Sequence, residues 1–265
     1  MVIGALAVIG LCFGSFVNAL VWRLKEKKNW INDRSECINC HHKLSAIDLI
    51  PVVSWLLLLG KCRYCRQKIS TLYPTIEVLL SLLYVASYVL WPDTIQGINI
   101  AIFSLWLITI TGLVALALYD FKWMILPTKI IYFLDSVAII MAVLNIVMAN
   151  NKTESIISYF LATLIGGGLF YIIFRLSNGR WIGGGDVRLG FLLGLIAATP
   201  QKIYLTIFMA AIIGTVISIP FLVIGKLKKS SLIPFGPFLI AAAIIVEFSG
   251  SNIIYWYSHM LLGIG

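Results

Sequence analysis

The sequence contains few charged residues. Only 12% of its 265 residues are Asp, Glu, Lys or Arg, whereas 60% are hydrophobic, and the mean hydropathy is +0.98. Soluble globular domains carry about 25% charged and about 45–50% apolar residues. This composition excludes a water-soluble enzyme. It indicates a polytopic membrane protein, which we expect to be all-α.

The sequence also lacks the signatures of several enzyme classes. It contains only three histidines, and no Ser, His and Asp set, His-Glu-x-x-His motif or P-loop is present, so serine and zinc proteases have no support. The net charge of +9 could suggest nucleic acid. In a membrane protein, however, excess Lys and Arg usually lie in cytoplasmic loops beside anionic lipid. We therefore expect membrane lipids, and no nucleic acid, among the partners.

Eight apolar stretches are candidates to cross a bilayer, which requires about 20 apolar residues. They run over Met1–Val21, Thr75–Trp91, Ile98–Leu118, Ile130–Ala149, Ile156–Phe174, Val187–Ala198, Ile203–Ile224 and Leu232–Val246. The stretch beginning at Val187 is the weakest, because it is short. The first stretch is not a secretory signal, because its basic residues follow the apolar run instead of preceding it.

The positive charges predict how these spans are oriented. With the N-terminus outside, the segments in the cytoplasm are 23–74, 119–129, 175–186 and 225–231. Only Lys152 and Lys202 then fall outside, as the positive-inside rule requires. Both termini are expected outside. We predict three parts, which are a first transmembrane helix (1–22), a cytoplasmic four-cysteine domain (23–74) and a membrane core (75–265).

Four of the five cysteines form two CxxC pairs in the first cytoplasmic loop. These are Cys37 with Cys40 and Cys62 with Cys65. Two such pairs about 20 residues apart can place four thiolates tetrahedrally around zinc. The reducing compartment argues against disulfides, and the flanking basic residues favour thiolates. We predict a structural zinc site, with a redox or an empty site as the alternative.

The same loop contains one apolar stretch, Ile50–Leu59. It is too short to cross a bilayer. Two interpretations stay open at this point: the stretch packs inside the cytoplasmic domain, or it lies at the membrane interface.

Two acids lie at the cytoplasmic ends of predicted helices. Asp120 follows the third span, and Asp186 ends a run of three glycines. One outward and one return helix separate them, so the topology brings them to the same membrane face. In an aspartyl dyad, one carboxylate deprotonates water and its protonated partner donates a hydrogen bond to the scissile carbonyl. Gly183 and Gly185 would let the backbone approach an extended substrate and adopt conformations closed to other residues.

Other acids near the membrane give alternative interpretations. Glu77 and Asp135 lie inside predicted spans, and we expect structural or substrate-positioning roles for them instead of catalysis. A transporter or scaffold that uses intramembrane acids to carry protons or ions is the alternative function. Transporters more often show inverted repeats and broken helices at mid-bilayer, whereas Asp120 and Asp186 sit at one rim.

Further motifs occur in order along the chain. They are Gly14-Ser15-Phe16-Val17-Asn18, Arg23, Arg34-Ser35, Ile50-Pro51, Ser54-Trp55, Gly60-Lys61-Cys62-Arg63, Tyr73-Pro74 with Glu77, Leu126-Pro127, and Pro234-Phe235-Gly236-Pro237. With the two CxxC pairs and the Gly-x-Gly-Asp ending at Asp186, the chain resembles the bacterial type IV prepilin peptidases over most of its length.

This resemblance implies an aspartyl endopeptidase of the bacterial inner membrane whose catalytic pair is Asp120 and Asp186. It implies that prepilin or pseudopilin precursors are cut after a Gly at the cytoplasmic face. It also implies that the new N-terminus is methylated from S-adenosylmethionine. A prepilin leader is short and basic, and the candidates to hold it are Glu77, Asp48 and anionic lipid.

The chain departs from the family pattern at three positions. Ile38 stands where Pro is common, Leu72 stands where Arg often precedes Tyr-Pro, and Thr128 replaces the Asp usual after Leu-Pro. Without an acid at position 128, Asp120 is the only carboxylate in that loop available for catalysis. The change at Leu72 falls in the half of the protein associated with methyl transfer.

Overall fold

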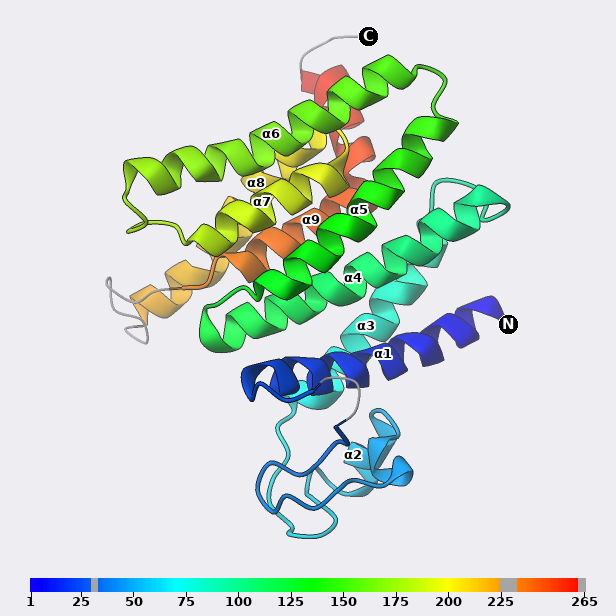
Figure 1. Cartoon of the computed structure of the whole chain (residues 1–265), viewed down its shortest axis with the longest axis vertical. Helices are drawn as coiled ribbons and strands as arrows, with labels where there is room; N and C mark the ends of the chain where they lie inside the picture. The colour runs from blue at the N-terminus through cyan, green and yellow to red at the C-terminus, as the bar shows by residue number, and fades with distance from the viewer. Residues whose placement is uncertain (30–32, 225–232, 262–265) are drawn as a thin grey trace. The chain divides into compact units, whose positions relative to one another are not determined.

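The computed structural model describes residues 1–29, 33–224 and 233–261 (Figure 1). Within these ranges all regular structure is helical, and β pairing is limited to two isolated bridges. The predicted all-α class is therefore confirmed. The predicted cytoplasmic segment 225–231 lies outside the described residues.

Seven helices of the described ranges are long and apolar enough to cross a membrane. They are α1 (Val2–Lys25), α3 (Leu72–Val89), α4 (Ile98–Trp123), α5 (Thr128–Met148), α6 (Lys152–Leu176), α8 (Pro200–Val223) and α9 (Gly236–Trp256). Each coincides with a predicted span. The weakest predicted span is helix α7 (Gly184–Ala197), which has 14 residues. It is about 21 Å long, shorter than the roughly 30 Å hydrocarbon core of a bilayer.

The chain divides into two compact units, Met1–Pro92 and Asp93–Gly265, and each is described by itself. The predicted three-part division into 1–22, 23–74 and 75–265 stays a prediction. The first unit contains α1 and α3 and, between them, two short elements: the 3-10 helix η1 (Ala46–Leu49) and the helix α2 (Val53–Leu57).

In the first unit, α1 packs directly against α3. The contact is close because α1 presents glycine to its neighbour: a Cβ on Gly10 would lie 2.6 Å from the Ser81 Cα, and one on Gly14 would overlap the Glu77 backbone. Small residues allow such backbone approach in membrane helix pairs. The Ser81 hydroxyl also donates to the Ala7 carbonyl across the pair, at 3.0 Å. The loop between the two helices therefore starts and ends at one membrane face.

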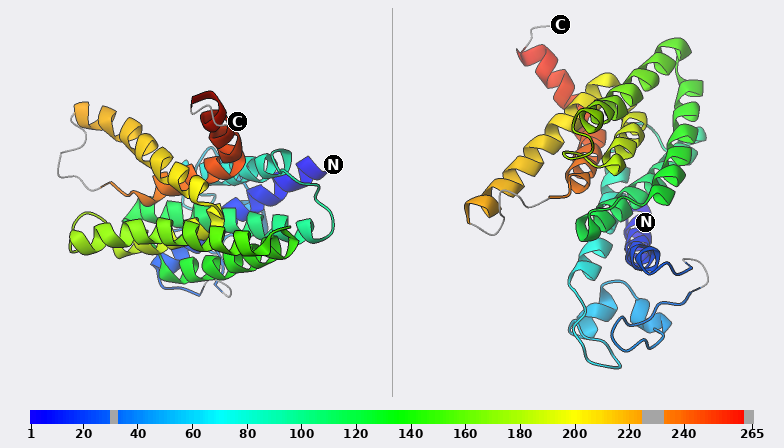
Figure 2. Two further views of the ribbon diagram at one scale, coloured as in Figure 1. Left: turned by 90° about the horizontal axis from the view of Figure 1, so that it is seen from above. Right: turned by 60° about the vertical axis from the view of Figure 1, so that its left-hand side comes forward.

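The second unit is a bundle of the six helices α4 to α9, followed by the short π-helix η2 (Tyr257–Leu261) (Figures 1 and 2). Helix α4 packs against α5 and α9, α7 packs against α5 and α6, and α8 packs against α6 and α9. The interior is apolar, with side chains such as Leu113, Leu134, Leu192 and Leu239 removed from solvent. This packing explains how α7 can be short: its neighbours, and not lipid alone, cover it.

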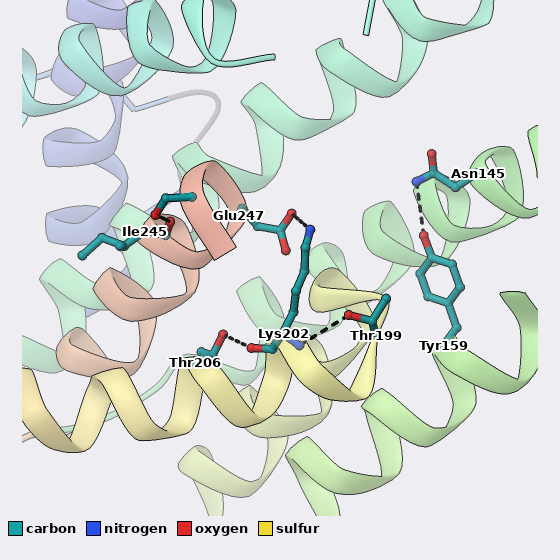
Figure 3. Close-up of polar contacts among 8 residues, drawn as sticks. Asn145, Tyr159, Thr199, Lys202, Thr206, Ile245 and Glu247 are labelled. Carbon is teal, nitrogen blue, oxygen red and sulfur yellow. Dashed lines mark hydrogen bonds and ion pairs between the residues drawn. The ribbon is translucent and has the colours of Figure 1, made fainter. Parts of the chain in front are cut away.

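Polar contacts tie helices of this bundle together (Figure 3). Lys202 at the start of α8 forms an ion pair with Glu247 of α9, with 3.2 Å between Nζ and Oε2. The Asn145 amide of α5 donates to the Tyr159 hydroxyl of α6 at 3.2 Å. An ionisable side chain inside a membrane span is costly unless it is paired. Lys202 and Glu247 supply each other's partner.

Candidate functional site

Asp120 lies in the last turn of α4. Its backbone carbonyl accepts the Met124 N–H at 2.7 Å, and Met124 takes the left-handed conformation that ends the helix. The Asp120 side chain is buried, with the residue only 5% exposed. The next helix begins directly after Pro127, which cannot continue a helix from the preceding residue. The local sequence therefore places the Asp120 carboxyl group at the end of α4.

Asp186 lies in the first turn of α7. Its Oδ2 accepts the backbone N–H of Gly183, the N-cap residue, at 3.1 Å. The first N–H groups of a helix have no partners within the helix, and the helix dipole favours negative charge there. Asp186 thus caps its own helix and is held in a position that stabilises a carboxylate.

The two carboxyl groups come together in the second unit. They lie close enough for the charge of Asp186 to act on Asp120. The Asp120 carboxyl also accepts the backbone N–H of Gly236, the first residue of α9. Each acid is therefore bound to the N-terminal end of a helix, Asp186 to α7 and Asp120 to α9. Like charges near one another make it costly for both groups to ionise.

The glycine run before Asp186 has ordinary backbone geometry. Positive φ angles occur at Gly60, Gly97 and Gly179 among the glycines described, and at none of the three in the run. The expectation that Gly183 and Gly185 adopt conformations closed to other residues is therefore wrong. At Gly185 the absence of a side chain instead permits close packing, because a Cβ there would lie 3.1 Å from the Leu126 Cβ.

Two contacts beside the pair could not be inferred from the sequence. Arg188 of α7 donates to the Thr128 hydroxyl at the start of α5, at 2.7 Å. Gly236 leaves no room for a side chain, because a Cβ there would overlap the Asp120 carboxyl. The motif around Gly236 is visible in the sequence, but its contact with Asp120 is not.

The four cysteines of the CxxC pairs gather in the first unit. The sulfur atoms of Cys37, Cys40, Cys62 and Cys65 all lie within 4.8 Å of one another, and Cys37 and Cys65 are 3.9 Å apart. Four thiolates at about 2.3 Å from a tetrahedral zinc are about 3.8 Å apart. The set fits that geometry, and these distances are too long for disulfides, whose sulfurs bond at about 2.05 Å.

Each CxxC pair forms the same kind of turn. The Cys37 N–H donates to the His42 carbonyl and the Cys62 N–H donates to the Gln67 carbonyl, at 3.0 and 2.8 Å. The residue after the second cysteine of each pair, His41 or Arg66, has a positive φ. Isolated β-bridges close both turns. The two turns, which we call the first knuckle (36–43) and the second knuckle (61–68), thus have the same backbone geometry. His41 is not one of the four clustered residues.

The protonation of the thiols differs within the cluster. Burial opposes ionisation of Cys37, but the backbone N–H groups of Cys40 and Asn39 and the neighbouring thiols lower its pKa to about 7. Cys65 accepts the Gln67 N–H, yet burial and the other three thiols raise its pKa to about 11. The expected help from flanking basic residues is not the main cause. Only a cation at the centre would let all four be thiolates together.

Asp48 links several segments of the cysteine module, which we define as residues 33–70, by hydrogen bonds. Its carboxylate accepts the Arg63 Nε at 2.6 Å, the Tyr64 hydroxyl at 3.0 Å and the Ser45 N–H at 3.0 Å. Its burial would raise the pKa, but these hydrogen bonds outweigh the burial and lower the pKa of Asp48 to about 2. The side chain is only 4% exposed, so its oxygens serve the module's own residues.

Glu77 also accepts hydrogen bonds from residues of its own unit. It lies in α3 and is buried at 7% exposure. Its Oε2 accepts the Val52 N–H at 2.7 Å, and Ser15 of α1 also donates to it. Glu77 thus connects α1, α3 and the start of α2. Asp135 lies half-buried in the second turn of α5.

Comparison with protein families divides the chain in the same way as its packing. Residues 8–91 match the family model for the bacterial peptidase A24 N-terminal domain. Residues 107–219 match the model for the type IV leader peptidase family. The first range lies within the first compact unit and the second range within the second unit. Asp120 and Asp186 fall in the leader peptidase range, and the cysteines fall in the N-terminal range.

Individual relatives cover nearly the whole chain. A protein of Vibrio cholerae named prepilin leader peptidase/N-methyltransferase is 32% identical over 92% of this chain and 95% of its own length. A protein of Bacillus subtilis with the same name is 28% identical over 97% of this chain and 98% of its own length. An Escherichia coli protein named type 4 prepilin-like proteins leader peptide-processing enzyme is 33% identical over 37% of this chain. No solved structure matches the chain significantly.

Proposed function

Because the chain belongs to the family of type IV prepilin leader peptidases, we propose that it is a membrane endopeptidase that removes the leader from prepilins or pseudopilins with Asp120 and Asp186. The observation that carries this assignment is the meeting of the two carboxyl groups at the N-termini of α7 and α9. The comparisons give no support to a transporter.

The chemistry follows from a pair that shares one proton. The ionised carboxylate takes a proton from water as the water attacks the scissile carbonyl, and the protonated partner donates a hydrogen bond to the carbonyl oxygen. Hydrogen bonds from Gly183 and Gly236 fix both side chains before substrate arrives. Rigid positioning of this kind contributes to the rate because reacting groups need not be reorganised.

The substrate would meet this site at the edge of the membrane. Asp120 and Asp186 lie at helix ends, and the exposed backbone of Gly183 beside them is open to an extended chain cut after Gly. Asp48 and Glu77 bind groups of their own unit, so anionic lipid is the better candidate to hold a basic leader. Glu77 then acts indirectly, by positioning the segment that starts at Val52.

A second activity follows from the relatives that are also named N-methyltransferases. We propose that the chain methylates the new N-terminus, with S-adenosylmethionine as the methyl donor. The four cysteines would hold a structural zinc ion, which supplies no reaction step, since four thiolates close the coordination shell. These residues shape the module that the N-terminal family model covers.

The protein is a multi-pass protein of the bacterial inner membrane. We propose that both termini lie outside and that the cysteine module lies in the cytoplasm. The support is the charge distribution, which leaves only Lys152 and Lys202 on the outer side.

The test is cleavage of a prepilin reconstituted into the same vesicles as the protein. Asp120→Asn and Asp186→Asn should each abolish cleavage, whereas Asp135→Asn, which changes an acid outside the pair, should retain it. Mass spectrometry of the mature N-terminus would show the added methyl group in the wild-type product when S-adenosylmethionine is present. Full cleavage by either variant of the pair would refute the assignment.

A further inference from the structure

The cysteine module has almost no apolar interior. No apolar residue of η1 or α2 is buried, and the buried positions of the second knuckle are Gly60 and Cys62. Four clustered thiols and the hydrogen bonds of Asp48 take the place of a hydrophobic core. Small domains commonly replace a core with a metal in this way. The apolar residues of the module must therefore have a different use.

These apolar side chains point outward. Between residues 47 and 59, those that are large and exposed are Ile47, Leu49, Ile50, Val53, Leu56, Leu57 and Leu59. Leu57 is 79% exposed and Leu59 is 83% exposed. The interpretation of Ile50–Leu59 as packed core is therefore wrong. Large exposed apolar side chains concentrated in one segment indicate a site of association.

The backbone holds this surface in place. Val52 and Leu59, on either side of α2, both have positive φ angles, which are costly for residues with branched side chains. The Val52 turn is fixed by the Glu77 carboxylate, which accepts its N–H. The Trp55 indole donates to the Ile69 carbonyl at 3.3 Å and its ring packs on Gly60. Strained residues persist only where surrounding contacts determine them, so the outward display of leucines is a built feature.

Charge beside the leucines indicates what covers them. Three exposed cations follow directly in the second knuckle, at Lys61, Arg66 and Lys68, besides Arg63, which is paired with Asp48. The only acid between residues 44 and 70 is Asp48, whose carboxylate is enclosed by the module. Apolar side chains next to a cationic group suit an anionic membrane surface, where leucines enter the acyl boundary and Lys or Arg meets the headgroups.

The topology keeps the module beside such a surface. The loop that carries it leaves α1 at Lys25 and enters α3 at Leu72, and both helices are candidate membrane spans that pack against each other. Both ends of the loop are thus tethered to one face of the bilayer. A tethered surface of leucines and cations needs no further partner to reach lipid.

We propose that α2 and the second knuckle dock on the anionic phospholipid surface, with Leu56, Leu57 and Leu59 inserted at the acyl boundary. Glu77 is a positioning residue for this contact, because it fixes the Val52 turn from inside α3. The contact holds the cysteine module against the membrane and does not depend on the peptidase assignment.

The experiment uses the full chain in nanodiscs that contain phosphatidylglycerol. A photo-crosslinking phenylalanine analogue replaces Leu57, and the matched control carries it at Lys43, an exposed polar position of the first knuckle. Adducts are identified by mass spectrometry, with a purified prepilin added in half of the samples. Only exposed side chains are changed, so folding is preserved, and the circular dichroism spectrum checks it.

The expected result is phospholipid adducts at position 57 that exceed those at position 43 about fivefold. This excess should be lost when Lys61→Gln and Lys68→Gln are introduced together or when phosphatidylcholine replaces phosphatidylglycerol. Each cation near a charged surface changes the docking equilibrium by about fivefold, so the two together change it by about 25-fold. Equal lipid labelling at both positions would overturn the proposal. Labelling at 57 only of prepilin, or only of other parts of this chain, would overturn it equally.

Discussion

The cysteine module and the aspartate pair are fixed by different kinds of interaction. In the module, the parts of the chain are held together by thiols, the Asp48 carboxylate and backbone hydrogen bonds, and the apolar side chains face outward. Around the aspartates, apolar helices form the interior, and polar groups enter only at helix ends. The comparison teaches that the module is built on a few polar contacts and a cluster of thiols, whereas the pair's geometry depends on distributed packing.

The strongest way to break this comparison is to remove the thiols. Cys37→Ser with Cys62→Ser takes one ligand from each knuckle, and structural zinc typically contributes about 10 kcal/mol or more to folding. We expect loss of bound zinc and loss of hydrogen-exchange protection in residues 33–70. The second unit, from α4 to α9, should keep its protection. Metal analysis and hydrogen-exchange mass spectrometry measure both.

Cys12→Ser is the matched control, because Cys12 lies on the surface of α1 away from the cluster. It should leave both the metal content and the exchange pattern unchanged. Two outcomes would contradict the conclusion that different interactions stabilise the two units. One is zinc retained at one ion per chain in the double variant, and the other is protection lost equally in both units.

Much of this arrangement could be predicted from the sequence, because it depends on local patterns. The spacing of Cys37, Cys40, Cys62 and Cys65 was sufficient to predict their cluster, and the apolar runs were sufficient to predict the spans. Since two helices connect Asp120 to Asp186, topology alone put them on one face. Each of these inferences uses residue type and distance along the chain, which a single sequence contains.

The contacts that could not be predicted join residues distant in sequence by specific side-chain geometry. Gly236 donates to Asp120 from a helix that begins more than a hundred residues later, and no spacing rule connects them. The same holds for Lys202 with Glu247 and for Glu77 with Val52. The sequence did not decide whether Ile50–Leu59 faces inward or outward, for a related reason. An apolar run alone does not show whether its side chains fill the interior of a small domain or whether a thiol cluster takes that place.

The ion pair of the second unit tests whether packing alone holds the bundle. Lys202→Met leaves Glu247 without its partner, and removing one member of a buried pair costs about 3 kcal/mol. Lys202→Met with Glu247→Gln should recover most of that loss, because no unpaired charge remains. Thermal unfolding in detergent, compared among the three proteins, measures this. A double variant as unstable as the single one would mean that the pair itself, and not the avoided charge, stabilises the bundle.

A glycine beside the pair tests how finely packing sets the carboxyl geometry. Gly236→Ala places a methyl group where the Asp120 carboxyl lies. A displacement near 1 Å can cost about a hundredfold in rate, so we expect that loss in the prepilin cleavage rate with little change in stability. Gly168→Ala on α6 is the control, because its Cβ would meet only the Leu164 side chain at 3.9 Å. Equal rates for both variants would show that Asp120 has freedom to move.

The smallest effect is expected at the brace of the module. Asp48→Asn removes the charge that Arg63 and Tyr64 share, and hydrogen bonds to charged groups contribute about 1–3 kcal/mol. The folded pKa of about 2 lies below the unfolded value of about 3.9, so the stabilisation is fully present above about pH 4 and is lost as pH falls through about 2. The difference in module stability between wild type and Asp48→Asn should therefore be constant from about pH 5 to 8, as measured by hydrogen exchange in residues 33–70. A difference that changes across this window would mean that a group other than Asp48 controls the contact, and the module would then depend on more than its thiols and a single carboxylate.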